Sequence, residues 1–166
     1  MTYFHCDLAD SSAIRTAISK VISEVGHPTI LINNAGIGRG KTILDASPDD
    51  LRLTFAINTL AHFLLTQACL PHMIERNHGM VVTVASLAAV GTAPNMVHYS
   101  ASKAAAVSFH EGLTSELKNA YGAPKVRTVL VCQGYTKTTL FQGFDEGDGF
   151  FACKAVLRSI EFSIVY

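Results

Sequence analysis

The fold of this chain is decided by an apolar run that leads directly into a polar turn: Thr29-Ile30-Leu31-Ile32-Asn33-Asn34-Ala35-Gly36. Residues 29–32 are apolar without alternation, which is typical of a β-strand buried on both faces. Such strands belong to parallel sheets that helices cover. Residues 33–36 carry the turn signal at the carboxyl end of this strand.

Upstream of this strand, the sequence predicts one amphipathic helix. Apolar side chains recur at intervals of three and four over residues 14–25, the stripe of a helix with one buried face. Asp10 or Ser11 can cap its start, and Gly26 suits a left-handed exit. Before this helix, residues 3–6 form a short β-prone run that predicts a further strand.

Downstream, the sequence predicts a long helix followed by a strand, a helix and a strand. Ser47-Pro48-Asp49-Asp50 combines a capping hydroxyl, a proline in the first turn and carboxylates at the positive end of the helix dipole. This helix should continue to about Glu75 and bend near Pro71. The later elements are a strand at residues 80–85, a helix at residues 98–120 and a strand at residues 126–132.

Strands and helices therefore alternate along the chain, and this order predicts an α/β fold with a doubly wound, Rossmann-like parallel sheet. Ligands of such sheets bind beyond the carboxyl ends of the strands. At or beside those ends this sequence carries Asp7, residues 33–36, Ser86 and residues 133–138.

The chain divides at about residue 142. Residues 1–142 form the predicted sheet domain, whereas residues 143–166 are an atypical tail. The tail begins with a turn-like segment at residues 144–149, and its last residues fit a helix or a strand equally well.

Composition excludes several classes of protein. The chain has 166 residues, of which 49% are hydrophobic and 16% charged, enough to bury a core and unlike a disordered chain. Thirteen basic and thirteen acidic residues leave no electrostatic footprint for nucleic acid or an anionic membrane. No membrane span or secretory signal is predicted. The four cysteines lack close pairs, which indicates reduced thiols in an intracellular protein.

The residues with the clearest chemistry are Tyr99 and Lys103, which lie four apart on a predicted helix and so share one face. A neighbouring ammonium favours the phenolate and should lower the pKa of Tyr99 towards working pH, as a proton donor or acceptor requires. Ser86 ends the preceding strand, where its hydroxyl could polarise a substrate carbonyl. Asn58 is a polar amide within a helix and needs a specific hydrogen-bond partner there.

The spacing of Tyr99 and Lys103 is not distinctive by itself, because the chain has a second copy at Tyr121 and Lys125. A serine even lies at the same offset before Tyr121. However, Gly122 and the proline after it interrupt that helix, so the second pair need not share a face.

Other motifs are weaker. Cys69 with His62, His72 and His78 fits no common zinc spacing, so no metal site is predicted. Ser86 lacks the glycines of a serine-hydrolase elbow, and the chain has no phosphate-binding loop motif. Three glycines between Gly36 and Gly40 are interpreted as a flexible loop with at most one backbone contact to a ligand.

Together, these segments resemble the short-chain dehydrogenase/reductase family over roughly residues 3–141. The resemblance rests on several features that occur in the family's order. Asp7 follows a predicted strand, the turn at residues 33–36 follows the next one, and Asn58 lies in a helix. Ser86 then precedes Tyr99-Ser100-Ala101-Ser102-Lys103. The segment His110-Glu111-Gly112-Leu113 is similar to the branch of retinol dehydrogenases and 17β-hydroxysteroid dehydrogenase-like enzymes.

The resemblance implies roles for four catalytic residues. Tyr99 would exchange a proton with the substrate oxygen, and Ser86 would orient that oxygen. Lys103 would hold the nicotinamide ribose and lower the pKa of Tyr99. Asn58 would hold a water in a proton relay. The substrate would be a small-molecule alcohol or carbonyl, and the protein a homo-oligomer.

The resemblance also implies an NADP or NAD cofactor, with NADP favoured. Asp7 would contact adenine, and Tyr99 and Lys103 would also face the cofactor. Leu8 and the turn at residues 33–36 would contribute largely main-chain contacts along the cofactor. The complete set of further cofactor contacts would be Leu8, Asn33, Asn34, Ala35, Gly36, Thr136 and Thr138.

The sequence departs from the family pattern in two places. Gln133-Gly134 stands where the family has Pro-Gly. The glycine-rich turn that holds the pyrophosphate lies two βα units before residues 3–6 in the family, which is roughly 50–60 residues at about 30 per unit. We therefore expect an N-terminally truncated chain whose strand at residues 29–32 is an exposed sheet edge.

These observations favour an NAD(P)-dependent oxidoreductase acting on a retinoid, a steroid or another lipophilic alcohol or carbonyl. The alternative is a non-catalytic fragment or pseudoenzyme that acts as an interaction or binding module. The expected location is intracellular, either cytoplasmic or membrane-associated through an anchor upstream of this chain.

Overall fold

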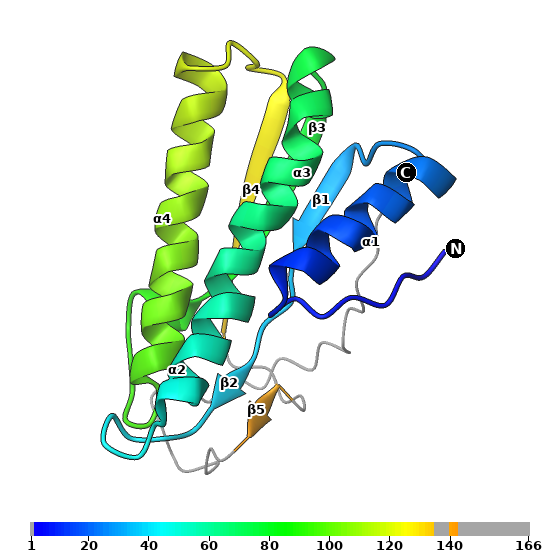
Figure 1. Ribbon diagram of the computed structural model, residues 1–166. Helices are drawn as coiled ribbons and strands as arrows, with labels where there is room; N and C mark the ends of the chain where they lie inside the picture. The colour runs from blue at the N-terminus through cyan, green and yellow to red at the C-terminus, as the bar shows by residue number, and fades with distance from the viewer. Residues whose placement is uncertain (1, 135–139, 143–166) are drawn as a thin grey trace.

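A computed structural model describes residues 2–134 and 140–142 (Figure 1). In chain order, its elements are α1 (Ser11–Glu24), β1 (Ile30–Asn33), β2 (Gly38–Arg39), α2 (Pro48–Phe55), the π-helical turn η1 (Ala56–Leu60), α3 (Ala61–Glu75), β3 (Gly79–Ser86), the 3₁₀ turn η2 (Leu87–Ala89), α4 (Val97–Asn119), β4 (Val126–Gln133) and β5 (Phe141–Gln142). The predicted alternation of strands and helices is confirmed.

The main sheet has three parallel strands in the order β1-β3-β4. Ile30 of β1 pairs with Met80 of β3, and Gly79 of β3 pairs with Val126 of β4. Helices α1, α3 and α4 lie over one face of this sheet (Figure 1). The described residues thus form an incomplete version of the doubly wound sheet, and β1 lies at its edge as predicted.

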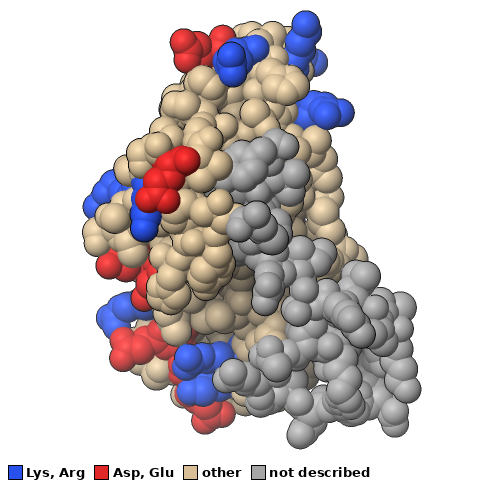
Figure 2. All heavy atoms as spheres, turned by 90° about the vertical axis from the view of Figure 1, so that its right-hand side faces the viewer, with Lys and Arg blue, Asp and Glu red and all other residues tan. Residues whose placement is uncertain are grey.

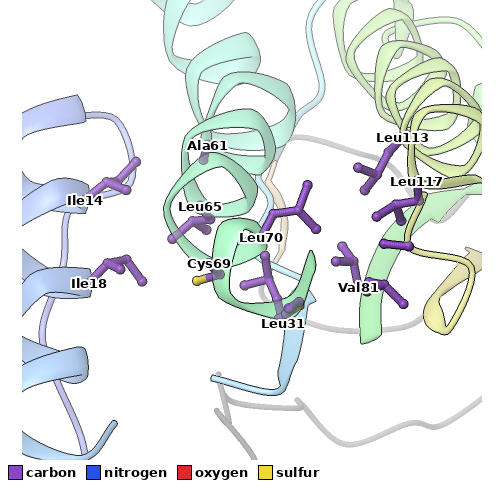
Figure 3. Packing of buried hydrophobic residues seen from close by; sticks show 13 residues of the cluster. Ile14, Ile18, Leu31, Ala61, Leu65, Cys69, Leu70, Val81, Leu113 and Leu117 are labelled. Carbon is purple, nitrogen blue, oxygen red and sulfur yellow. The ribbon is translucent and has the colours of Figure 1, made fainter. Parts of the chain in front are cut away.

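The core lies between the helices and this face of the sheet (Figure 3). Ile14 and Ile18 of α1 approach Leu65 and Cys69 of α3, and all four side chains are buried. Burying one such aliphatic side chain stabilises the folded chain by about 1.5–3 kcal/mol. The amphipathic stripe read from the sequence is therefore the contact surface between α1 and α3.

The start of α2 is held by the predicted cap. Ser47 Oγ accepts a hydrogen bond from the Asp50 N–H, and the Asp50 carboxylate accepts one from the Ser47 N–H. The same carboxylate accepts from Lys41 Nζ at 2.6 Å and from Arg39 Nη1 at 2.7 Å. These hydrogen bonds, with Lys41 the largest contributor, hold the pKa of Asp50 well below its ordinary value.

Two predictions about local structure are wrong. Residues 3–6 are not a strand, because none of the described strands pairs with them and an unpaired strand leaves its backbone groups without hydrogen bonds. The glycine run after residue 36 is not simply a loop, because Gly38 and Arg39 form β2, which pairs with β5.

The predicted helix from Pro48 to Glu75 is confirmed. It continues through Pro71, and its departure from α-helical geometry is the π-helical turn at Ala56–Leu60. By length and composition this helix could cross a membrane, but half of its most apolar window is buried in the protein. It is packed as the core helix of the sheet domain, against α1 and β3.

Charges of both signs are mixed on the face shown in Figure 2, with uncharged residues between them. The carboxyl ends of β1 and β3, by contrast, carry buried polar side chains, among them Asn33 and Ser86. The candidate functional residues therefore lie at those ends.

Candidate active site

Tyr99 and Ser86 come together at the carboxyl end of β3. Ser86 is the last residue of that strand, and Tyr99 lies in the first turn of α4. The Tyr99 hydroxyl hydrogen-bonds to the side chain of Ser86, and both side chains are buried. Ser86 Oγ also accepts from the Ala88 N–H at 3.1 Å, which fixes its direction. The structure therefore pairs the two hydroxyls that the sequence singled out.

The predicted effect of Lys103 on Tyr99 is wrong for this structure. Burial raises the pKa of Tyr99, and the hydrogen bond from Ser86 offsets this only in part. The Lys103 ammonium instead donates to the Val84 carbonyl at 2.9 Å. The phenol of Tyr99 is thus stabilised in its neutral, proton-donating form.

Lys103 is a buried cation, with only 3% of its surface exposed. Burial lowers its pKa to about 8. An ammonium has three N–H donors, and Val84 accepts one of them. The remaining donor capacity of Lys103 suits hydroxyl oxygens such as those of a ribose.

Asn58 lies in the π-helical turn and binds both backbone groups of one residue. Its Oδ1 accepts from the Ile37 N–H at 2.8 Å, and its Nδ2 donates to the Ile37 carbonyl at 2.9 Å. Nδ2 also donates to Ser102 Oγ at 3.0 Å. The polar amide within the helix therefore has the specific partners that its position required. π-helical turns of this kind occur frequently at functional sites.

Two further side chains continue this contact along the same helix. His62 lies four residues after Asn58 and faces the carbonyl of Ala35. Thr66 lies four residues later again and accepts from Asn33 Nδ2 at 3.3 Å. Asn58 thus holds residue 37 and Thr66 holds the Asn33 side chain at the end of β1, whereas neither ring nitrogen of His62 has a hydrogen-bond partner among the described residues. The spacing of four was visible in the sequence, but it was not used there.

His62 is the main residue of this site that sequence reasoning missed. Its side chain is 1% exposed. Burial, and secondly the positive charge of Lys103, lower its pKa to about 4, while the Ala35 carbonyl opposes the shift. His62 is therefore a neutral ring next to the buried cation.

Gly36, in the segment after β1, lies against Lys103 and Asn58. A β-carbon on Gly36 would lie 3.3 Å from Lys103 Nζ and 3.3 Å from Asn58 Oδ1. The backbone therefore passes close to the ammonium, an approach that glycine allows because it has no β-carbon. Within the described residues, the donor capacity of Lys103 beyond its hydrogen bond to Val84 could serve the ribose hydroxyls of a dinucleotide.

The remaining predicted residues lie elsewhere or are not described. Asp7 is exposed at the turn before α1, where its Oδ1 accepts from the Ala9 N–H at 2.9 Å. Leu8 packs partly buried against the core. Thr136, Thr138 and the predicted tail at residues 143–166 lie outside the described residues.

The second tyrosine–lysine copy is not organised as the first. Tyr121 is 47% exposed and donates to Glu116 at 3.1 Å. Gly122 takes a positive φ of 59°, so the chain turns away before Lys125. The structure therefore separates the two copies as the helix interruption predicted.

Known proteins with similar sequences are dehydrogenases. The family model of short chain dehydrogenases matches residues 1–149. Dehydrogenase RED3 of Cochliobolus heterostrophus is 45% identical over 76% of this chain and 64% of its own length. Human 17-beta-hydroxysteroid dehydrogenase 13 is 41% identical over 80% of this chain and 44% of its own length. Retinol dehydrogenase 10-B of Danio rerio is 40% identical over 84% of this chain and 41% of its own length.

Solved structures share the same arrangement. A short-chain dehydrogenase from Streptomyces avermitilis superimposes with a TM-score of 0.74 at 30% identity, over 84% of this chain and 50% of that one. A metagenomic short-chain oxidoreductase in complex with NADP superimposes with a TM-score of 0.72 at 30% identity, over 80% of this chain and 58% of that one. This chain thus spans about half the length of the proteins it matches.

Proposed function

Because this chain belongs to the short-chain dehydrogenase family, we propose that it is an NAD(P)-dependent oxidoreductase that interconverts an alcohol and a carbonyl. The observation that carries the proposal is the pair of buried hydroxyls of Ser86 and Tyr99 at the end of β3, with the Lys103 ammonium buried on the same helix as Tyr99. A proton donor, a second hydroxyl and a fixed cation are the groups that such a reaction requires.

The residues of this chain would act on the substrate oxygen. Ser86 donates a hydrogen bond to that oxygen and orients it. Tyr99, neutral because of its burial, would give its proton to the substrate oxygen when a carbonyl is reduced, and the Tyr99 phenolate would take a proton from the substrate when an alcohol is oxidised.

The nicotinamide group, when bound, supplies or accepts the hydride. Lys103 would hold its ribose hydroxyls, and the main chain of Gly36 would lie against it. Asn33, Asn34 and Ala35 would line the same path, and Asp7, Leu8, Thr136 and Thr138 would contact the rest of the cofactor. We favour NADP, which a structural neighbour binds.

The substrate we propose is lipophilic, such as a retinoid or a steroid. The named relatives include a retinol dehydrogenase and a 17-beta-hydroxysteroid dehydrogenase. Between Ser86 and Tyr99 the chain exposes Leu87, Val90 and Val97, of which Val90 is 86% exposed. These exposed apolar side chains, which lie between Ser86 and Tyr99 in the sequence, support an apolar substrate. We also propose a homo-oligomer in the cytoplasm or at an intracellular membrane.

The test is the turnover of all-trans-retinal and of a ketosteroid by the purified chain with NADPH or NADH, followed by nicotinamide absorbance. Tyr99→Phe should lower the rate about 10²–10⁴-fold, since a positioned proton donor contributes that much. Tyr121→Phe is the matched control and should leave the rate unchanged, because that hydroxyl is at the surface.

A non-catalytic role as an interaction module is the second candidate. Among the described strands, β1 lies at the edge of the main sheet, where another chain could pair with it, and this supports the second candidate. A fluorescence titration with NADPH separates the two. If the chain binds NADPH and Lys103→Ala abolishes that binding, the result supports the enzyme. If neither NADPH nor NADH binds, the result supports the interaction module.

A further inference from the structure

Ser102 joins the π-helical turn to the helix that carries Tyr99 and Lys103. Its side chain is completely buried. Its Oγ accepts from Asn58 Nδ2 at 3.0 Å and donates to the Tyr99 carbonyl at 2.7 Å. Its own carbonyl accepts from Thr59 Oγ1 at 3.0 Å. Three hydrogen bonds therefore meet at this one residue.

The hydrogen bond to Ser102 and the two hydrogen bonds to Ile37 all select the same orientation of the Asn58 carboxamide. A serine hydroxyl has a single proton, and Ser102 gives it to the Tyr99 carbonyl. Ser102 Oγ therefore faces Asn58 as an acceptor, and only the N–H₂ side of the amide can meet it. The oxygen of the amide is then directed to the Ile37 N–H.

The consequence reaches the segment that passes Lys103. Asn58 Oδ1 holds Ile37, and it also lies 3.3 Å from the position of a β-carbon on Gly36. A rotated or mobile amide would release Ile37 and let the turn before it move relative to the Lys103 ammonium. Ser102 Oγ is linked to this turn through two hydrogen bonds, from Asn58 to Ser102 and between Asn58 and Ile37, and it reinforces the orientation of the amide that holds the turn.

We propose that Ser102 is a positioning residue that orients the Asn58 carboxamide and so holds the backbone of residues 36–37 beside Lys103. This role rests on the proposed function of the site. Alanine is a better helix former than serine, and a buried hydroxyl is unfavourable without partners, so a role in packing alone does not account for this side chain.

The test compares Ser102→Ala with Ser100→Ala. Ser100 lies on the same helix, is 7% exposed, and its Oγ accepts from Thr92 Oγ1 at 2.8 Å, away from Asn58. Hydrogen exchange at the Ile37 amide should be about tenfold faster in Ser102→Ala than in the unaltered chain, and unchanged in Ser100→Ala. Turnover should show a kcat lower by about tenfold with an unchanged KM, the signature of an interaction needed only in the transition state.

Ser102→Cys is the second variant, since it keeps the shape of the side chain and weakens both of its hydrogen bonds. It should shift exchange at Ile37 in the same direction. Unchanged exchange at Ile37 in the folded variants would overturn the inference, as would a failure of both variants to fold, which would indicate a folding role alone. If the unaltered chain has no turnover, the proposed function fails, and the exchange experiment still decides the role of Ser102.

Discussion

Gly36 passes Lys103 so closely that a β-carbon on the glycine would lie 3.3 Å from the lysine Nζ. The ammonium cannot move aside freely, because it donates to the Val84 carbonyl at 2.9 Å. Asn58 Oδ1 lies at the same 3.3 Å from that β-carbon position, and it accepts from the Ile37 N–H. Both side-chain atoms next to Gly36 are therefore held by hydrogen bonds to backbone groups.

The first prediction concerns this approach. Gly36→Ala should lower the free energy of unfolding by about 1–2 kcal/mol, because the added methyl overpacks a rigid contact. It should also weaken NADPH binding. Gly112→Ala is the matched control: Gly112 lies in α4, and a β-carbon there meets nothing within 4 Å. That change should stabilise the chain by about 0.5–1 kcal/mol. Urea denaturation measures both, and equal effects would contradict the close contact.

The second prediction concerns the buried histidine. The pKa of His62 is lowered to about 4, below its ordinary value of 6.5, so the unfolded chain binds the proton more readily than the folded one. Stability is therefore lost as the pH falls through this window, by about 2 kcal/mol between roughly pH 7 and pH 5. His62→Leu should remove this share of the loss. Urea denaturation at both pH values measures it, and an unchanged pH dependence in the variant would show that His62 titrates normally.

The third prediction concerns the start of α2. Ser47→Ala removes the cap that accepts from the Asp50 N–H at 3.1 Å, and should cost about 1 kcal/mol of stability. Ser23→Ala in α1 is the control, since that exposed hydroxyl only bonds the Lys20 carbonyl. It should change the melting temperature little. A loss as large for Ser23 as for Ser47 would argue against a specific capping contribution.

Local sequence signals predicted most of the elements. The stripe of residues 14–25, the cap at Ser47 and the unbroken apolar run before Asn33 each depend on neighbouring residues, and each is found in the structure. Residues 3–6 failed as a strand because strand formation depends on a partner elsewhere in the chain.

The catalytic geometry was only partly predictable. The sequence placed Tyr99 beside Lys103 on one helical face, but the degree of burial, which raises the pKa of one and lowers that of the other, depends on the tertiary structure. The π-helical turn was not predictable from Ala56–Leu60 alone. Its Asn58 is held by Ile37 and Ser102, which lie 21 and 44 residues away in the sequence.

The π-helical turn lets one helix carry an additional residue without changing how its two ends face the protein. A π turn accommodates one residue more than the α-helical turn it replaces. Deleting one residue of Ala56–Leu60 would therefore restore α-helical spacing and leave α2 and α3 facing as they do now. The side chains within the turn would change direction instead, and Asn58, which pairs with both backbone groups of Ile37, is one of them. The additional residue thus shapes the site and not the packing of the 28-residue helix.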